Sequence, residues 1–479
     1  MAVFTSRCTN GGLSAVSRED PMYETRWHGR STAKWLFREE ADAEHERSRT
    51  AYPPGTIRDK DQARGLVADH PAIAAATIGA LAVHATLSVE QVAAFVGIEA
   101  DDLIASGVLQ ALWSMGAVAF GHVTNVWDRS WARTLWTIND KSVIATHVLP
   151  LLSGAEALAM NAGQAIHLSQ GHHRHALLAA ELALRIAEFT PVGTVLGERL
   201  TELKSLFGTH TTRRGDLTAV REDGLRIVLE VVAHDNQEFG QKADFWAEQL
   251  ATPRRGYGMT MVVFVVAADP KSSASRARGL GGRVSAAIVK ARAKHGATWR
   301  GHDRMGLVSW EDWFPAAGEM SPAFSSLTVR FPESRLTHAS VLDAAIVPCA
   351  HPGDREYVAV IENTSLLAQT PAWLRSHARA QVVLHRMGLP RLSDVPSPPL
   401  AKPKRPRSTS KGCGAAGQAK LPPRLLGPPG EHVDARATIA LQPPAPPPPS
   451  QSPPSTPTVV RRRQPRRPTA ATQEPVSPI

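Results

Sequence analysis

The sequence predicts a mixed α/β fold that is followed by a tail without a packed core. Apolar residues recur at helical spacing from 71 to about 116, and two short β-prone runs follow them. Strand-like and helix-like patterns then alternate between 213 and 310. After 400, prolines and basic residues replace the apolar positions. That last segment lacks the apolar surface that a folded domain buries.

The positive charge of the chain belongs to this tail. The 479 residues include 54 Lys or Arg and 44 Asp or Glu, which gives a formal charge of +10. The segment 401–479 holds 13 of the bases, three of the acids and 19 of the 37 prolines. The first 400 residues therefore carry 41 bases and 41 acids. We predict a charge-balanced folded body and a disordered, proline-rich basic tail over 400–479.

Several classes of protein are disfavoured by simple features. The apolar runs, such as 261–268, are shorter than the roughly 18 residues that suggest a membrane span. The N-terminus has no apolar stretch of signal-peptide length. Three widely spaced cysteines offer neither a disulfide framework nor a zinc site. We expect a cytoplasmic protein without a transmembrane helix, and we predict a polar, partly disordered leader over 1–68.

The first folded module is predicted over 69–140. Helices are expected over 71–84, 89–96 and 101–115, and Ser88 with Gln91 forms a capping box before the second. Two β-prone runs on either side of a loop follow. Three helices and a hairpin are the order of a winged helix-turn-helix.

The charges in this module argue against direct base contact by its third helix. That helix, 101–115, begins with Asp101 and Asp102 and contains no Lys or Arg. The cations are Arg129 and Arg133 on the expected wing. Two hypotheses stay open: the wing and the tail contact DNA phosphates, or the module binds another protein.

Residues 172–207 predict a long helix that is interrupted at 191–193. His172, His173 and His175 lie at its start, but only the first and third share a helix face. We therefore favour capping and packing roles for these histidines over metal binding.

Residues 213–267 carry the clearest functional signal. A short strand, a turn centred on Asp-Gly, a mostly apolar strand over 225–233, a helix over 238–250 and a buried strand over 259–267 follow one another. Asp216 and Glu230 lie at the ends of the first two strands, which would place them side by side. A carboxylate inside a buried strand is costly without a partner, so Glu230 requires one.

This order of elements resembles the restriction-endonuclease-like core, in which two acids bind Mg²⁺ and a lysine two residues after the second acid helps to activate water. Residues 70–267 more closely resemble the replication-relaxation family of plasmid and mobile-element proteins, found largely in actinobacteria. The matching positions are His175, Asp216, Glu230 and Lys242, of which Lys242 lies within "GQKADFWAEQL". The resemblance implies a restriction-endonuclease-like α/β domain over 160–320, with catalytic Asp216, Glu230 and Lys242 and with Asp216 and Glu230 as metal ligands.

Two positions depart from these patterns. Gly215 stands where the family has proline, and Val232 stands where the nuclease pattern has lysine. Lys242 could supply the missing cation from the next helix, and Glu181 could add a third carboxylate. Alternatively, Asp216 caps the hairpin and Glu230 pairs with Lys242 or an arginine, which leaves a sheet that binds without cutting. Because of Val232, we favour the version without catalysis.

The remaining chain is less specific. Residues 278–296 predict a basic helix with a glycine-rich start, and 326–392 predict a small α+β appendage of undisclosed role. The tail has two basic islands that suit nucleic-acid phosphates. Their residues are Lys402, Lys404, Arg405, Arg407, Arg461, Arg462, Arg463, Arg466 and Arg467.

Three functions are compatible with these features. The first is a DNA-binding protein of a plasmid or mobile element that acts in replication or its control, with replication or transfer proteins as possible partners. The second is a Mg²⁺-dependent DNA nuclease. The third is a winged-helix transcriptional regulator.

Overall fold

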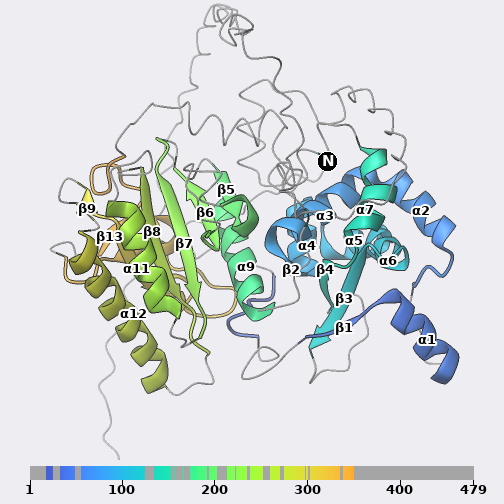
Figure 1. The fold of residues 1–479 in the computed structure, drawn as a ribbon, viewed down its shortest axis with the longest axis horizontal. Helices are drawn as coiled ribbons and strands as arrows, with labels where there is room; N and C mark the ends of the chain where they lie inside the picture. Colours follow the sequence, from blue (N-terminus) through green and yellow to red (C-terminus); the bar gives the residue numbers. More distant parts are fainter. Residues whose placement is uncertain are drawn as a thin grey trace, which may run out of the picture. The chain divides into compact units, whose positions relative to one another are not determined.

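The computed structural model has the mixed α/β architecture that the sequence predicts (Figure 1). It describes residues 18–24, 33–48, 55–123, 134–152, 173–201, 213–234, 238–251, 259–269, 274–334 and 338–349, apart from a few positions within these ranges. An N-terminal region of helices and a small antiparallel sheet is followed by a seven-stranded mixed sheet with helices. The basic tail lies outside the described residues.

The small sheet contains the predicted hairpin. Its strand order is β1 (Ala33–Leu36), β3 (Val118–Val123), β4 (Leu135–Ile138) and β2 (Thr86–Ser88), and all neighbours are antiparallel. Buried side chains of the surrounding helices cover it, with Trp113, Phe120 and Trp136 in one aromatic cluster. The hairpin β3–β4 is therefore confirmed, and β1 and β2 extend it at both edges.

Two of the three predicted helices have the expected bounds. They are α3 (Pro71–His84) and α4 (Val89–Val96), and the Ser88–Gln91 capping box is present. The prediction of one helix over 101–115 is wrong, because the chain forms α5 (Ala100–Ala105) and α6 (Val108–Ser114). Gly107 lies between them at φ +71°, and a Cβ there would lie 2.8 Å from Leu66. Both the backbone conformation and the close approach suit glycine alone.

Residues 1–68 contain more than the expected leader. Besides β1, they include α1 (Arg38–Ser48) and α2 (Lys60–Asp69), and the latter buries Ala63 and Val67. Met22, in the segment 18–24, is also fully buried and belongs to the core of the large sheet. A few buried apolar side chains are enough to pack this polar stretch against the folded core. Its polar composition therefore did not predict these contacts.

The large sheet has the strand order β13-β12-β11-β8-β7-β6-β5. The central strands β7, β8 and β11 are parallel, and both flanks are antiparallel. The bounds are β5 (Thr194–Gly197), β6 (Leu217–Val220), β7 (Arg226–Val232), β8 (Thr260–Val266), β11 (Met305–Ser309), β12 (Thr328–Arg330) and β13 (His338–Ser340).

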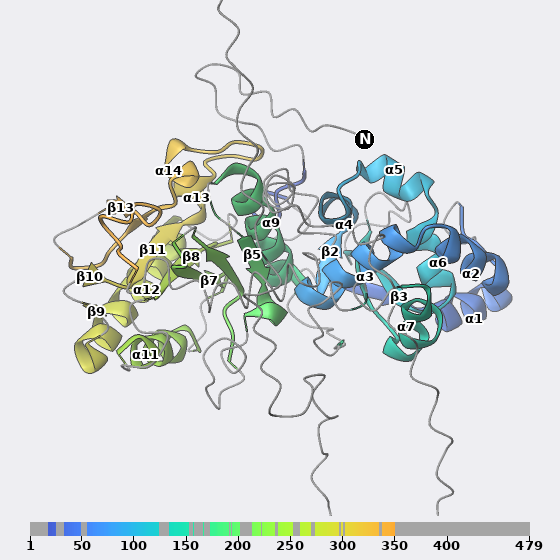
Figure 2. The ribbon, with the colours of Figure 1, turned by 90° about the horizontal axis from the view of Figure 1, so that it is seen from above.

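Helices lie on both faces of this sheet (Figure 2). One face packs against α11 (Glu238–Ala251) and α12 (Ala274–His295), through Val228, Val262 and Phe264. The other face packs against α9 (His173–Phe189), α13 (Trp310–Trp313) and α14 (Pro322–Ser325). The remaining described elements are α7 (Lys141–His147), the 3-10 helices η3 (Leu149–Leu151) and η4 (Glu198–Leu200), and the strands β9 (Thr298–Trp299) and β10 (His302–Asp303).

Two further predictions about elements need correction. The helix expected to resume after 193 begins instead as strand β5 and the short η4. The stretch 326–392 is not a separate appendage at its start, because β12 and β13 continue the large sheet from β11. Residues 350–392 lie outside the described part of the chain.

No single helix among the described residues is long and apolar enough to cross a membrane. Helices α2 and α3 reach that length and composition only as a pair, and a bend of 98° separates them.

Candidate functional site

The hairpin β6–β7 brings the two predicted acids together. Asp216 directly precedes β6, and its backbone N–H donates to the carbonyl of Leu229. Its carboxylate Oδ2 accepts the backbone N–H of Val231 at 2.7 Å. Glu230 lies between these two β7 residues, on the strand face that α11 covers. The sequence interpretation that placed the two acids side by side is therefore consistent with the structure.

Three side chains from the neighbouring helices complete a cluster around these acids. Lys242 Nζ, on α11, donates to Glu230 Oε2 at 2.8 Å and lies 4.0 Å from Asp216 Oδ1. Trp246 Nε1, one turn further along α11, donates to Glu230 Oε1 at 2.7 Å. His175 Nε2, at the start of α9, lies 3.0 Å from Asp216 Oδ1. We call Asp216, Glu230, Lys242, Trp246 and His175 the acid cluster.

The two carboxylates differ in their proton affinity. Burial is the largest influence on Glu230, and together with the charge of Asp216 it raises the pKa of Glu230 to about 7. Burial also acts to raise the pKa of Asp216, but His175, Lys242 and the Val231 N–H outweigh it and lower that pKa to about 2. Asp216 is therefore the permanent anion of the cluster, and Glu230 binds a proton near neutral pH.

The two cations respond in the opposite sense. Burial acts to lower the pKa of His175, yet Asp216 raises it overall. Burial likewise acts against the charged form of Lys242, but Asp216 and Glu230 raise the pKa of Lys242 overall. The side chains of Lys242 and His175 are 37% and 26% exposed, whereas that of Glu230 is 1% exposed. The cations thus lie at the surface, above the buried carboxylates.

These residues do not fit a magnesium ion. Mg²⁺ requires carboxylate oxygens that are open to it, in near-octahedral geometry. Each carboxylate oxygen of Asp216 and Glu230 already accepts a hydrogen bond from a protein donor, and Lys242 lies between the two groups. Moreover, no three His, Cys, Asp or Glu side chains in the described ranges are grouped as metal ligands. The arrangement is a closed set of ion pairs and hydrogen bonds.

The two departures from the nuclease pattern have physical reasons. Val228 packs against Gly215 so closely that any Cβ at 215 would overlap its Cγ1 atom. A proline at 215 would therefore force the side chain of Val228 to shift. Val232 is buried with Val228 against α11 and α12, in an apolar core where a lysine would lose its hydration. The cation comes instead from α11, as Lys242.

Glu181 does not join the acid cluster, so this expectation is wrong. It lies in the middle of α9, fully buried, and accepts hydrogen bonds from Arg18 at 3.3 Å and Arg185 at 2.9 Å. Asp20 adds a carboxylate 2.9 Å from Arg185, and Gln91 Nε2 also donates to Glu181. We call Arg18, Asp20, Glu181 and Arg185 the α9 ion network.

The sequence patterns signalled these residues unevenly. No sequence pattern singles out Trp246, because an indole on the apolar face of the helix over 238–250 looks like any other core residue. Arg18 and Asp20 lie in a segment with no helical or strand period. The proposed DNA contacts Arg129 and Arg133, and all nine basic residues of the tail islands, lie outside the described residues.

Comparison with known proteins adds no assignment: no family model, no curated protein and no solved structure matches this chain.

Proposed function

We propose that this chain is a DNA-binding protein of a plasmid or mobile element, acting in replication or its control, and that it binds DNA without cutting it. The observation that carries the second half of this proposal is the closure of the acid cluster. All four carboxylate oxygens are engaged by His175, the Val231 N–H, Lys242 and Trp246. A nuclease site of this type needs open carboxylates to hold its metal.

The DNA-binding half is supported by charge and by the order of elements. The segment 401–479 carries 13 bases against three acids, a density that suits the phosphate backbone. After α2, the N-terminal region has four helices before the β-hairpin, because α5 and α6 stand in place of the single third helix. This order supports a winged-helix type of module, and the hairpin is followed by the restriction-endonuclease-like order of strands in β6, β7, α11 and β8.

The acidic residues of α5 argue against contact between this helix and DNA. Asp101 and Asp102 occupy the first turn of α5, and α6 contains no basic residue. Phosphate contact by these helices is therefore unfavourable. The proposal assigns that contact to Arg129 and Arg133 and to the basic islands of the tail.

A footprinting experiment on the element's own replication origin and promoters tests this proposal. The full chain is expected to protect a site in the origin. Protection confined to promoters would instead favour the alternative of a winged-helix transcriptional regulator. If no site is protected and plain duplex DNA is not retained at low salt, the DNA-binding proposal fails.

The second candidate function is a Mg²⁺-dependent DNA nuclease. The observation in its favour is that Asp216, Glu230 and Lys242 do meet at one place, as the resemblance implies, and that the Lys242 side chain is partly exposed there. A metal-dependent nicking assay separates this candidate from binding alone.

A further inference from the structure

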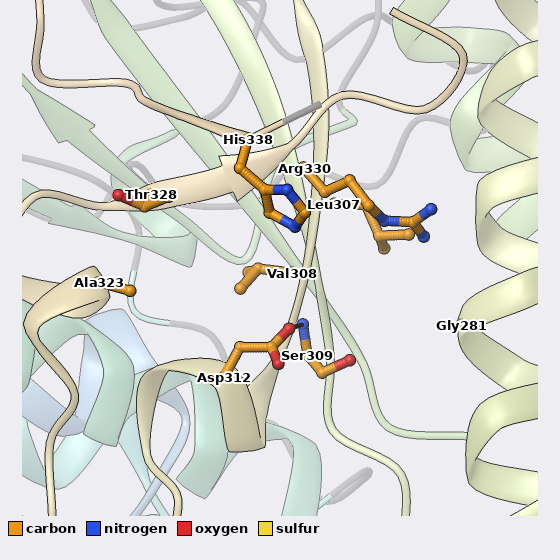
Figure 3. A pocket seen from close by; sticks show the side chains of 9 residues that line it. All are labelled: Gly281, Leu307, Val308, Ser309, Asp312, Ala323, Thr328, Arg330 and His338. Carbon is orange, nitrogen blue, oxygen red and sulfur yellow. Dashed lines mark hydrogen bonds between the residues drawn. The ribbon is translucent and has the colours of Figure 1, made fainter. Parts of the chain in front are cut away.

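A separate cavity lies at the carboxyl end of the parallel strand β11. Its volume is about 240 Å³, and β11, β12, β13, α12, α13 and α14 all contribute to its walls (Figure 3). In open sheets with parallel strands, ligands bind at the carboxyl ends of the strands. The cavity shares no residue with the acid cluster.

One wall of the cavity carries two cationic or donor groups. Arg330 of β12 and His338 of β13 are directly opposite each other across the antiparallel pair. Their neighbours Val329 and Ala339 point into the core, so both polar side chains face the cavity side of the sheet. Both are exposed, and neither forms an ion pair or side-chain hydrogen bond within the described part of the chain. They are available to bind an anion.

The facing wall carries acceptor and hydroxyl groups. Asp312 Oδ2 accepts the backbone N–H of Ser309 at 3.1 Å, at the start of α13. Its second oxygen, Oδ1, accepts no hydrogen bond from any residue that the structure describes. Figure 3 shows the Ser309 hydroxyl directed toward α12, on the same side as the Arg330 guanidinium. This wall therefore suits a ligand that donates hydrogen bonds.

The third wall is helix α12, at a position where it lacks a side chain. Gly281 lines the cavity, and a Cβ built there would meet no atom within 4 Å. Gly279 and Gly282 are also helical. A glycine inside a helix is destabilising relative to alanine. At Gly281 the missing side chain leaves open the space between α12 and Arg330.

We propose that this cavity binds a small phosphate monoester that carries hydroxyl groups, such as a sugar phosphate. The guanidinium of Arg330 binds two phosphate oxygens at once, and His338 donates a ring N–H in either protonation state. The carboxylate of Asp312 accepts a hydrogen bond from a hydroxyl group of the ligand. The volume is below the roughly 300–1,000 Å³ of pockets for drug-sized ligands, and the convex backbone of duplex DNA does not enter such a cavity.

Calorimetric titration of the full chain with ribose 5-phosphate tests this proposal, with ribose and inorganic phosphate as reference ligands. The sugar phosphate is expected to bind more tightly than either reference. Arg330→Gln should weaken binding at least tenfold, as expected when a charge-assisted hydrogen-bonding pair is lost. Gly281→Leu should abolish it by filling the cavity. Lys290→Gln, at an exposed position later in α12 that has no partner among the described residues, should leave it unchanged.

Circular dichroism and thermal unfolding confirm that each variant is folded. Competition with a 5′-phosphorylated oligonucleotide then identifies the source of the phosphate monoester. Displacement of the sugar phosphate would assign the monoester to a nucleic-acid end, and no displacement would assign it to a free small molecule. The proposal is overturned if ribose 5-phosphate does not bind, if inorganic phosphate binds equally well, or if folded Arg330→Gln binds like the unchanged chain.

Discussion

Lys242 is the residue on which the acid cluster depends. It contacts Glu230 directly and lies within ion-pair distance of Asp216, so one partly buried cation pairs with the anion Asp216 and with the ionised form of Glu230. Removing one partner of a fully buried ion pair costs about 3–5 kcal/mol, because the remaining charge loses both water and partner. The 37% exposure of Lys242 reduces this figure, since water can partly replace the cation.

Substitution Lys242→Met is therefore expected to lower the free energy of unfolding by about 2 kcal/mol at pH 7. The methionine keeps the apolar stem of the side chain but leaves Asp216 and Glu230 without their cation. Chemical denaturation measures the change. Lys290→Met on α12 is the matched control and should change stability by less than about 0.5 kcal/mol, because Lys290 is exposed and has no partner in the described ranges. Equal effects of both substitutions would contradict this account of the cluster.

Glu230 gives the cluster a defined pH dependence. Its pKa in the folded state is about 7, above the value of 4.5 for a glutamate in the unfolded chain. Between these two values the folded protein holds a proton that the unfolded chain has released. The stability from this group is thus present below about pH 4.5 and is lost as the pH rises through 7.

The variant Glu230→Gln should remove this loss, since glutamine resembles the protonated acid. Its stability relative to the unchanged chain is expected to increase by about 1 kcal/mol per pH unit between pH 5 and 7, and then to level off. Denaturation midpoints of both chains at a series of pH values measure this difference in stability. A difference that stays constant over this range would show that Glu230 is ionised throughout.

The sequence predicted part of the acid cluster. The pairing of Asp216 with Glu230 followed from strand order and turn length, and the need for a partner followed from the cost of a buried charge. The closed geometry did not follow, because it depends on where α11 and α9 pack. Only that packing brings Trp246 and His175 onto the remaining carboxylate oxygens.

At the scale of elements, the segment 18–24 is held against α9 by charges. Arg185 is fully buried, with Asp20 at 2.9 Å, Glu181 at 2.9 Å and the ring of Phe314 at 4.3 Å from its guanidinium carbon. Arg18 adds a second cation to the same network. A polar segment of this kind has no period that a sequence pattern can detect, so the contact was not predictable.

A double-mutant cycle with Asp20→Asn and Arg185→Met measures this attachment. Arg185→Met should cost about 3–5 kcal/mol, because it leaves the buried Asp20 without its cation, and Asp20→Asn should cost less, because Arg185 keeps Glu181 as a partner. The coupling between them should exceed about 1 kcal/mol. The reference cycle uses Asp61→Asn and Arg64→Met, an exposed ion pair one turn apart on α2, where the coupling should stay below about 0.5 kcal/mol. No coupling between Asp20 and Arg185 would mean that the segment is not held by this pair.

Element bounds followed from sequence wherever local signals were strong. Ser88, Gln91 and Gly97 define both ends of α4, and the Asp-Gly turn fixes the hairpin β6–β7. The errors arose at positions where distant contacts decide. Gly107 ends α5 because Leu66 packs against it, and β5 forms because its edge pairs with β6.

Across the whole molecule, the net positive charge lies in the C-terminal segment 401–479. The first 400 residues are formally neutral, and the excess of ten positive charges belongs to 401–479. Affinity for DNA that arises from net charge is therefore assigned to the tail. Each phosphate contact made by a cation steepens the salt dependence of duplex binding by about 0.9 in log–log slope.

A chain that ends at Leu400 should retain duplex DNA at least tenfold more weakly at low salt than the full chain. It should also show a shallower dependence of binding on salt concentration. Filter binding at several salt concentrations measures both quantities. A variant with all nine basic residues of the two islands changed to glutamine should behave like the truncated chain. Unchanged retention by the truncated chain would contradict the role given to the tail.

The organisation of the large sheet was predictable only in part. The central order β7, α11, β8, α12, β11 followed from alternating patterns, since strands joined by helices become parallel neighbours. The strands β12 and β13, at one side of the sheet, have only three residues each, too few for a pattern to show that they continue the same sheet.

A closed acid cluster, with every carboxylate oxygen engaged, should leave a protein that binds DNA without cutting it. Incubation of the full chain with supercoiled plasmid, in Mg²⁺ and in Mn²⁺, tests it most directly, with the Asp216→Ala/Glu230→Ala variant alongside. The account predicts retarded plasmid in a native gel and fully supercoiled plasmid once the protein is removed. Metal-dependent nicked circles that disappear with the double variant would contradict it.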